Sequence, residues 1–245
     1  MVTVPSEYRR DDRPLLSIII PAFNEAERLP ETLERIIVFT GSMSADVEVI
    51  VVDNASNDGT RDVVSAFSSR NPSVRCIYEG LRGKGAAVRT GIMEGRGMYL
   101  LICDADLAVP IEEVDKFVPR LKDNDIIIGS HETEGAKRFG EPFHRHLMGR
   151  VFNVIVRTLL LPGLHDTQCG FKCFRRDVAR DLFSLNTIDG WSFDAEILYM
   201  ARQKNYRIAE LPVMWYYGER SKINLTRDTW LMLKEVMAIR RNWKR

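Results

Sequence analysis

The chain has 245 residues with 35 basic and 34 acidic side chains, which gives a formal charge of +1. Its hydrophobic content of 45% is that of a folded domain and excludes a disordered chain. The balanced charge argues against a general nucleic-acid-binding protein, so we expect no nucleic-acid partner. No apolar run is long enough to span a bilayer, and the polar tail over residues 1–14 lacks the apolar stretch of a signal peptide. These features predict an intracellular protein.

The four cysteines are scattered along the chain. Cys169 and Cys173 lie four residues apart, but no second pair accompanies them. A zinc site needs about four such ligands, and a disulfide framework is typical of small secreted chains. We therefore expect reduced and buried thiols, and no structural zinc.

The first half of the chain alternates strand and helix patterns. Short, continuous apolar runs are typical of strands buried on both faces, and helical periodicity separates them. We expect strands at 15–20, 47–52, 74–78, 98–103 and 125–128, and helices at 29–37, 57–67, 85–93 and 112–121. This order predicts an α/β fold with a mostly parallel central sheet and helices on both faces.

The order of elements changes after residue 130. We expect a mobile polar loop at 131–141, helices at 144–161, 192–203 and 225–243, and strands at 171–174 and 207–211. No low-complexity linker interrupts the chain. We therefore predict one compact domain over 15–224 and a C-terminal helix with a basic end over 225–245.

Acidic and glycine-rich segments follow the predicted strands. In open parallel sheets, ligands bind beyond the carboxyl ends of the strands. There the sequence carries residues 21–25 (PAFNE), 53–60 (DNASNDGT), 82–85 (RGKG) and 104–106 (DAD). The first strand is not followed by the GxGxxG turn of a dinucleotide site, so that kind of site fits poorly.

Asp104 and Asp106 are the strongest candidate ligands. Burying two carboxylates at one strand end requires a counter-charge, which Mg²⁺ or Mn²⁺ supplies together with a diphosphate. The alternative is two turn aspartates at the surface. Asp53 can accept hydrogen bonds from a nucleoside or cap the next turn. Lys84, between glycines, can reach phosphate oxygens or lie in a solvated turn.

Together these segments resemble the inverting glycosyltransferases of family 2. That resemblance implies a GT-A fold, a nucleotide-sugar donor, and Mg²⁺ or Mn²⁺ held by Asp104 and Asp106. It also implies that the donor is bound by Pro21, Ala22, Phe23, Asn24, Glu25, Asp53, Lys84, Gly85, Asp104, Ala105 and Asp166.

Two later segments narrow the resemblance. Residues 166–172 (DTQCGFK) and 190–196 (GWSFDAE) resemble the dolichyl- and polyprenyl-phosphate hexosyltransferases, closest to dolichyl-phosphate β-glucosyltransferases. The resemblance implies transfer of glucose from UDP-glucose to a polyprenyl phosphate, or alternatively of mannose from GDP-mannose. The related mannose synthases usually read Gly-Ser-Arg where this chain has Gly129-Ser130-His131, so an arginine for the acceptor phosphate is missing there.

A phosphate acceptor changes what the catalytic groups must do. Its second pKa is about 6, so it can attack without a base, and cations are needed to hold it near the leaving diphosphate. Candidates for the acceptor phosphate are Arg138, Arg145, Arg150, Arg220, Ser221 and Lys222. The expected catalytic set is Asp104, Asp106, Asp194, Arg145, Arg220 and Lys222. We interpret Asp194 as orienting an arginine or a sugar hydroxyl, with helix capping as the alternative. Asp166 is read as a sugar or arginine partner, or as a turn residue.

A lipid acceptor requires a membrane surface. The helix at 144–161 has an apolar side, and the last helix carries Trp230 and Trp243 with a basic end, RRNWKR. These are marks of a helix lying in an anionic interface, so we expect peripheral attachment at the cytoplasmic face. The alternative is that both helices pack on the core.

Two other functions stay open. One is a family 2 transferase acting on a sugar or protein hydroxyl, which would need Asp194 or a neighbour as a base. The other is a non-catalytic nucleotide-sugar-binding protein, against which the intact Asp104 and Asp106 pair argues.

Overall fold

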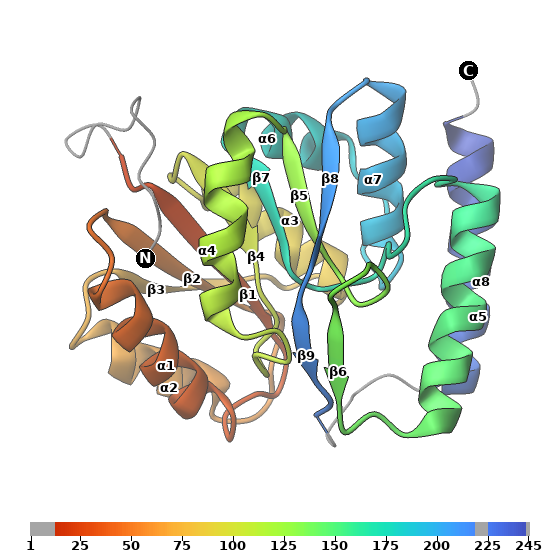
Figure 1. The fold of residues 1–245 in the computed structure, drawn as a ribbon. Coiled ribbons are helices and arrows are strands. Elements are labelled where there is room, and N and C mark those ends of the chain that lie inside the picture. The colour runs from red at the N-terminus through yellow and green to blue at the C-terminus, as the bar shows by residue number, and fades with distance from the viewer. Residues whose placement is uncertain (1–12, 219–224, 244–245) are drawn as a thin grey trace.

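The structure is a computed structural model that describes residues 13–218 and 225–243. Within two of its helices, the side chains of residues 143–148, 151–152 and 225–230 are not described. The fold is a central sheet with helices on both faces and a pair of helices at one side (Figure 1).

The central sheet has seven strands in the order β3-β2-β1-β4-β7-β5-β8. Their bounds are β1 Leu16–Ala22, β2 Val47–Asp53, β3 Val74–Tyr78, β4 Tyr99–Ile102, β5 Ile126–Ser130, β7 Lys172–Arg175 and β8 Ile208–Pro212. Strand β7 is antiparallel to both of its neighbours, and the other pairs are parallel. The sheet is therefore mostly parallel, as predicted, with one reversed strand near its centre.

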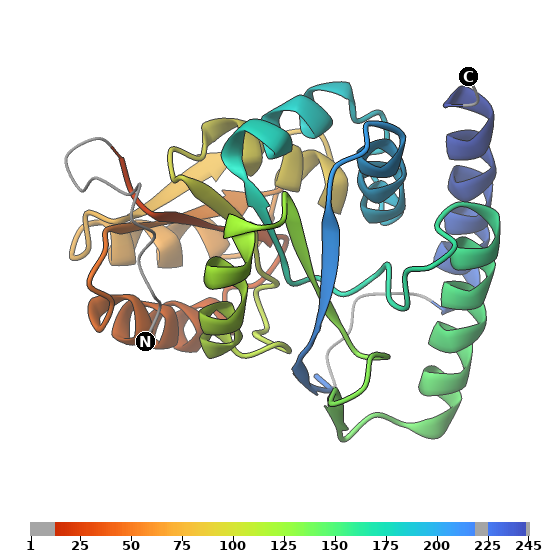
Figure 2. The same cartoon turned by 45° about the horizontal axis from the view of Figure 1, so that its top comes forward.

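Successive side chains of the buried strands face two different cores. Ile18 and Ile20 pack in one apolar cluster, whereas Ile19 packs in the other. The first cluster is covered by α1 (Leu29–Gly41), α2 (Thr60–Ser68) and α4 (Val114–Phe117). The second is covered mainly by α3 (Lys84–Glu94), α6 (Arg176–Leu185) and α7 (Phe193–Gln203), which lie across the sheet from α1 and α2 (Figure 2). Burial on both faces explains why these strands read as unbroken apolar runs.

Helices α5 (Phe143–Leu159) and α8 (Leu225–Asn242) lie side by side at one side of the sheet (Figures 1 and 2). The inner side of α8 buries Val236 and Ile239 in the second cluster. Trp243 is only partly exposed, and its Nε1 donates a hydrogen bond to Glu196 Oε1 at 3.1 Å. Trp243 thus anchors the end of α8 to α7 and does not point outward as a free interfacial tryptophan.

Several local expectations are corrected. The polar segment 131–141 contains strand β6 (Lys137–Phe139), which pairs with β9 (Met214–Tyr216) in a small parallel sheet. The pairing partner lies far away in the sequence, so the local pattern does not reveal it. The expected helix at 112–121 is split into a 3₁₀ turn, α4 and a second 3₁₀ turn at Val118–Lys122, where Pro119 removes a backbone donor. Helix α6 was not predicted.

Candidate active site

The loops after β1 and β2 are joined by hydrogen bonds at the carboxyl edge of the sheet. Asn24 N donates to Ser56 Oγ at 3.0 Å, and Asn57 N donates to Asn24 Oδ1 at 2.9 Å. Glu25 N donates to Thr60 Oγ1 at 2.8 Å. These bonds bring the predicted Pro21–Glu25 segment directly against the segment that follows Asp53.

Asp53 is buried at the end of β2 and is already paired. Arg61 Nη2 lies 2.8 Å from Asp53 Oδ2, and Ser56 N donates to Asp53 Oδ1 at 3.2 Å. The Arg61 guanidinium also lies over the Tyr78 ring, 4.5 Å from its centroid. The opposing Phe23 ring lies under the Arg82 guanidinium at 4.9 Å. Two arginine–aromatic pairs therefore flank this end of the site, and their planar groups are of the kind that stacks on a nucleobase.

Asn54 fixes the loop that carries Lys84. Its side-chain amide donates to Leu81 O at 2.7 Å and accepts from Gly83 N at 2.8 Å. A Cβ at Gly83 would lie 2.1 Å from Asp189 O, and one at Gly85 would lie 2.4 Å from Ile188 O. Glycine is required at both positions because the 188–190 loop approaches this backbone closely.

Lys84 joins this loop to the end of β4. Its Nζ lies 2.5 Å from Asp104 Oδ1 and 5.6 Å from the centroid of the Trp191 ring. Burial on its own lowers the pKa of Lys84, but the carboxylates of Asp104, Asp194 and Asp106 outweigh burial, so its pKa is raised. Lys84 therefore stays protonated and is a fixed positive charge beside Asp104.

Two glycines lie beside the paired aspartates, and the approach of Gly170 requires that it has no side chain. A Cβ at Gly170 would lie 2.0 Å from Asp104 Oδ2, and one at Gly218 would lie 3.6 Å from Asp106 Oδ2. Asp106 also accepts a hydrogen bond from Ala108 N at 3.1 Å. The predicted pair thus lies between residues 169–170 on one side and the end of the β9 segment on the other.

The donor set at this edge fits a divalent cation that a diphosphate would complete. Asp104 and Asp106 supply carboxylate oxygens from one turn, and Asp104 Oδ2 has no hydrogen-bond partner among the described residues. Within residues 13–218 and 225–243, no group of three or more His, Cys, Asp or Glu side chains could hold a metal. A pair of carboxylates matches the way Mg²⁺ and Mn²⁺ bind together with substrate phosphates.

Asp194 lies in the first turn of α7 and faces the same region. Its Oδ1 is 2.8 Å from Nζ of Lys172, a lysine whose side chain is 1% exposed. Burial raises the pKa of Asp194, while Lys172 and Lys84 oppose that rise, and the net pKa lies above its usual value. Among the described residues, Asp194 is therefore paired with a lysine, and the arginine partner that one interpretation expected stays a prediction.

Asp166 is paired with His131, the residue that stands where the mannose synthases usually have an arginine. His131 Nδ1 lies 2.8 Å from Asp166 Oδ2, and His131 N donates to the same oxygen at 2.9 Å. Gln168 N donates to Asp166 Oδ1 at 3.0 Å, and Asp166 N donates to Glu210 Oε1 at 2.8 Å. Both carboxylate oxygens of Asp166 are therefore bonded inside the protein. In the structure the Asp166 carboxylate holds the His131 ring and backbone.

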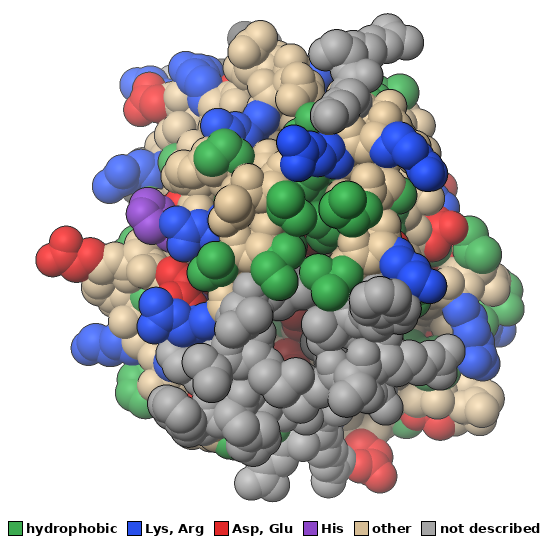
Figure 3. Space-filling model, turned by 90° about the vertical axis from the view of Figure 1, so that its right-hand side faces the viewer, with side chains coloured by type: hydrophobic (Ala, Val, Ile, Leu, Met, Phe, Trp, Pro, Cys, Tyr) green, Lys and Arg blue, Asp and Glu red, His purple; other side chains and the backbone are tan. Residues whose placement is uncertain are grey.

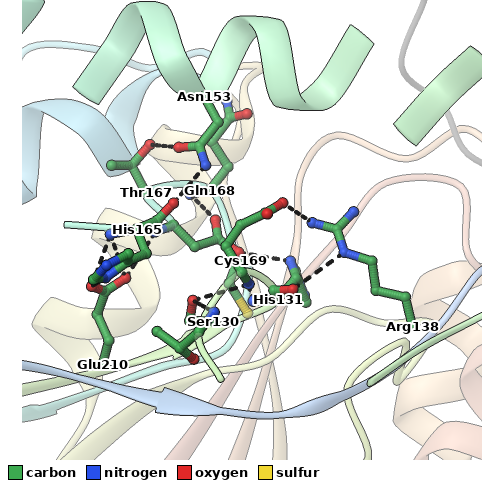
Figure 4. Close-up of polar contacts among 12 residues, drawn as sticks. Ser130, His131, Arg138, Asn153, His165, Thr167, Gln168, Cys169 and Glu210 are labelled. Carbon is green, nitrogen blue, oxygen red and sulfur yellow. Dashed lines mark hydrogen bonds and ion pairs between the residues drawn. The ribbon is translucent and has the colours of Figure 1, made fainter. Parts of the chain in front are cut away.

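The predicted acceptor-phosphate residues have different outcomes. Arg138, on β6, bonds Glu132, lies 2.8 Å from Glu141 and donates to the backbone oxygen of His131 (Figure 4). Arg150 is exposed on α5, 4.0 Å from Glu132. Arg220, Ser221 and Lys222 lie outside the described residues, as does the side chain of Arg145.

Three side chains at the site were not predicted to act there. Arg61 and Arg82 lie over aromatic rings beside Asp53 and Phe23, and Lys172 lies beneath Asp194. The sequence does not indicate the roles of the two arginines, because each role depends on contact with an aromatic ring from another element. Lys172 does carry one, since a lone lysine in an otherwise apolar predicted strand requires a buried counter-charge.

The His131–Asp166 pair predicts a pH-dependent stability. Burial on its own lowers the pKa of His131, but the Cys169 sulfur and the Asp166 carboxylate outweigh burial and raise that pKa to about 10. A group whose folded pKa is raised stabilises the fold below its unfolded pKa, near 6.5, and loses that effect as the pH rises toward the folded value. Urea unfolding should therefore show the advantage of the natural chain over His131→Asn shrinking between pH 6.5 and 10.

His165→Asn is the matched control, because this histidine is 56% exposed and its pair with Glu210 is screened by solvent. A difference between the natural chain and His131→Asn that stays constant from pH 6.5 to 10 would contradict the assigned pairing.

Known proteins match this chain in sequence and in fold. The family model described as "Glycosyl transferase family 2" matches residues 17–183. The dolichyl-phosphate beta-glucosyltransferase of Dictyostelium discoideum is 36% identical over 244 residues, covering 94% of this chain and 75% of the relative. The human protein of the same name is 33% identical over 255 residues, covering 97% of this chain and 78% of the relative.

A solved structure shares the fold. Glucosyl-3-phosphoglycerate synthase from Mycobacterium tuberculosis, in complex with Mn²⁺, uridine diphosphate and phosphoglyceric acid, superposes with a TM-score of 0.66 over 94% of this chain and 78% of that one. At 17% identity this likeness establishes the GT-A fold alone. From the family match and the relatives that cover most of its length, the chain belongs to glycosyl transferase family 2 and is a glycosyltransferase.

Proposed function

We propose that this enzyme transfers glucose from UDP-glucose to the phosphate of a dolichyl or polyprenyl phosphate, with inversion at the sugar carbon. The observation that carries the proposal is the Lys84–Asp104–Asp106 arrangement at the sheet edge, in a chain whose relatives are named dolichyl-phosphate beta-glucosyltransferases. Transfer of mannose from GDP-mannose is the alternative within the same site.

The described residues suit a nucleotide diphosphate at this edge. The nucleoside would lie between Phe23 and Asp53, where Arg61 and Arg82 supply planar cationic groups. Lys84 would neutralise part of the diphosphate. Asp104 and Asp106 would hold Mg²⁺ or Mn²⁺, which when bound withdraws negative charge from the leaving diphosphate.

The acceptor phosphate requires positioning more than activation. A phosphate monoester is an anion near neutral pH and can attack the sugar carbon without a general base. This agrees with Asp194, whose Oδ1 is held by the Lys172 ammonium. Asp194 would orient a sugar hydroxyl through its other oxygen. The competing function, transfer to a sugar hydroxyl, would require Asp194 to take a proton, and its raised pKa is the observation that favours it.

The face formed by α5 and α8 is suited to a membrane surface. Val154, Leu231 and Met237 are about half exposed there. Figure 3 shows that apolar side chains gather on this face with Lys and Arg side chains around them. No helix among the described residues is long and apolar enough to cross a membrane. Peripheral binding to an anionic cytoplasmic leaflet would bring the lipid acceptor to the site.

The first prediction from the proposed function concerns the reaction itself. Incubation with labelled UDP-glucose, dolichyl phosphate and Mg²⁺ should move label into the organic phase, and EDTA should abolish the transfer. Asp106→Ala should reduce transfer by at least about 1,000-fold, because a metal contact contributes several kcal/mol to the transition state. Asp194→Asn should leave measurable activity, because no base is needed.

Equal loss of activity in Asp106→Ala and Asp194→Asn at saturating substrates would favour the hydroxyl acceptor with Asp194 as base. Faster transfer from GDP-mannose than from UDP-glucose would replace glucose by mannose in the proposal.

The second prediction concerns the membrane. The protein should sediment with vesicles containing anionic lipid at low salt, and added salt should release part of it. Leu231→Asp combined with Met237→Asp should weaken this binding at least about tenfold, because two exposed apolar contacts are lost. Val38→Asp is the control, since Val38 is 75% exposed on α1, away from this face. If Val38→Asp weakened vesicle binding as much as the double variant, the assignment of this surface as the membrane contact would be contradicted.

A further inference from the structure

Lys172 is an unusual residue for its position. It begins β7, the reversed strand between β4 and β5, and its side chain is 1% exposed. An ionised lysine removed from water carries a desolvation penalty of several kcal/mol unless it is paired and hydrogen-bonded. Its buried charge therefore needs partners, and the structure shows two of them.

The first partner is the Asp194 carboxylate, whose Oδ1 lies 2.8 Å from Lys172 Nζ. Asp194 Oδ2 has no hydrogen-bond partner in the part of the chain that the structure describes, although the residue is only 8% exposed. Among the described residues, the charges of Lys172 from β7, Lys84 from α3 and Asp104 from the end of β4 act on Asp194. One oxygen is thus fixed by Lys172, and no described residue bonds the other.

The second partner is the backbone oxygen of Cys169, which accepts a hydrogen bond from Lys172 Nζ at 2.5 Å. The next residue, Gly170, packs so closely on Asp104 that a Cβ there would lie 2.0 Å from Asp104 Oδ2. By holding Cys169, Lys172 therefore holds the turn that lies against the candidate metal ligand.

These contacts place alternating charges across the site. Lys172 forms an ion pair with Asp194, and Lys84 forms one with Asp104. The negative charge of Asp194 also raises the pKa of Lys84. Removing the buried Lys172 charge leaves Asp194 beside Asp104 with Lys84 alone to balance both. The consequence is a displaced Asp194 and a loosened Cys169–Gly170 turn.

We propose that Lys172 is a positioning residue of the transfer reaction, which sets Asp194 Oδ2 toward the substrate and holds the Gly170 turn on Asp104. This inference rests on the proposed function for the identity of the substrate, a nucleotide sugar. Lys172 itself touches no substrate, because its ammonium is covered by the two groups that it bonds.

The test is a double-mutant cycle of Lys172→Met and Asp194→Asn. Lys172→Met has nearly the same shape without the charge, and it leaves a buried carboxylate unpaired. Its Tm should fall by roughly 10 °C. The double variant removes both charges, so it should recover at least about half of that loss. The control, Lys204→Met, breaks an exposed pair with Asp181 and should change Tm and activity little.

Catalysis should not recover with the Tm. In Lys172→Met and in the double variant, kcat should fall about 100-fold at saturating donor, since a small misplacement of reacting groups has an effect of this size. The acid limb of the kcat/KM profile of Lys172→Met should also move to higher pH, because Lys172 lowers the pKa of Asp194. Recovery of kcat together with Tm in the double variant, or an unmoved acid limb in Lys172→Met, would overturn the positioning role and leave Lys172 a structural residue.

Failure of the proposed function is distinguishable from failure of this inference. If the natural chain transfers no hexose to dolichyl phosphate, the proposed function fails. The same variants then report through Mn²⁺-dependent UDP affinity, which Lys172→Met should weaken at least about tenfold by loosening the turn on Asp104. Unchanged UDP affinity would overturn the inference.

Discussion

Asp104 and Asp106 bring two negative charges to the end of one buried strand, and the surrounding residues are arranged to balance them. Lys84 supplies a permanent positive charge 2.5 Å from Asp104. Its loop is held by Asn54 from the end of β2 and by the close approach of the 188–190 loop. The arrangement still carries an excess of negative charge beside Asp106, which a divalent cation would offset while it also binds a diphosphate. The demand for balanced charge thus brings together Asn54 after β2, Lys84 after β3 and Asp104 after β4.

Much of the fold follows from the sequence because its strands are buried on both faces. The run before Pro21 and the run before Asp53 both read correctly as strands, since burial imposes apolar, β-branched residues along their whole length. Exposed short strands carry no such requirement. Segment 137–139 becomes a strand only through pairing with 214–216, and the polar residues around it suggested a loop.

The site could be predicted where a residue's role depends on its own strand end. Asp53, Lys84, Asp104 and Asp106 all lie at the expected edge. Roles that depend on a partner from elsewhere could not be predicted. Asp166 proves to hold His131, and Arg138 is held by Glu132 and Glu141. These pairings join residues whose proximity only the tertiary structure creates.

The last helix is connected to the same site through the 187–192 loop. Glu196 is buried, and it accepts hydrogen bonds from Thr187, Ile188 and Trp243. The loop that it holds packs against the glycines on either side of Lys84. One side of α8 thus supports the donor loop while its other side exposes Leu231 and Met237. Trp243, from the basic C-terminal segment, belongs to the supporting side.

The central claim is that this edge of the sheet binds a nucleotide diphosphate together with a divalent cation. Calorimetric titration of UDP with and without Mn²⁺ tests this claim most directly. The account predicts that Mn²⁺ strengthens UDP binding at least about tenfold in the natural chain. It predicts that Asp106→Ala loses this enhancement and keeps the weaker cation-independent binding through Asp53 and Lys84. UDP binding of equal strength in Mn²⁺ and in EDTA would contradict the account.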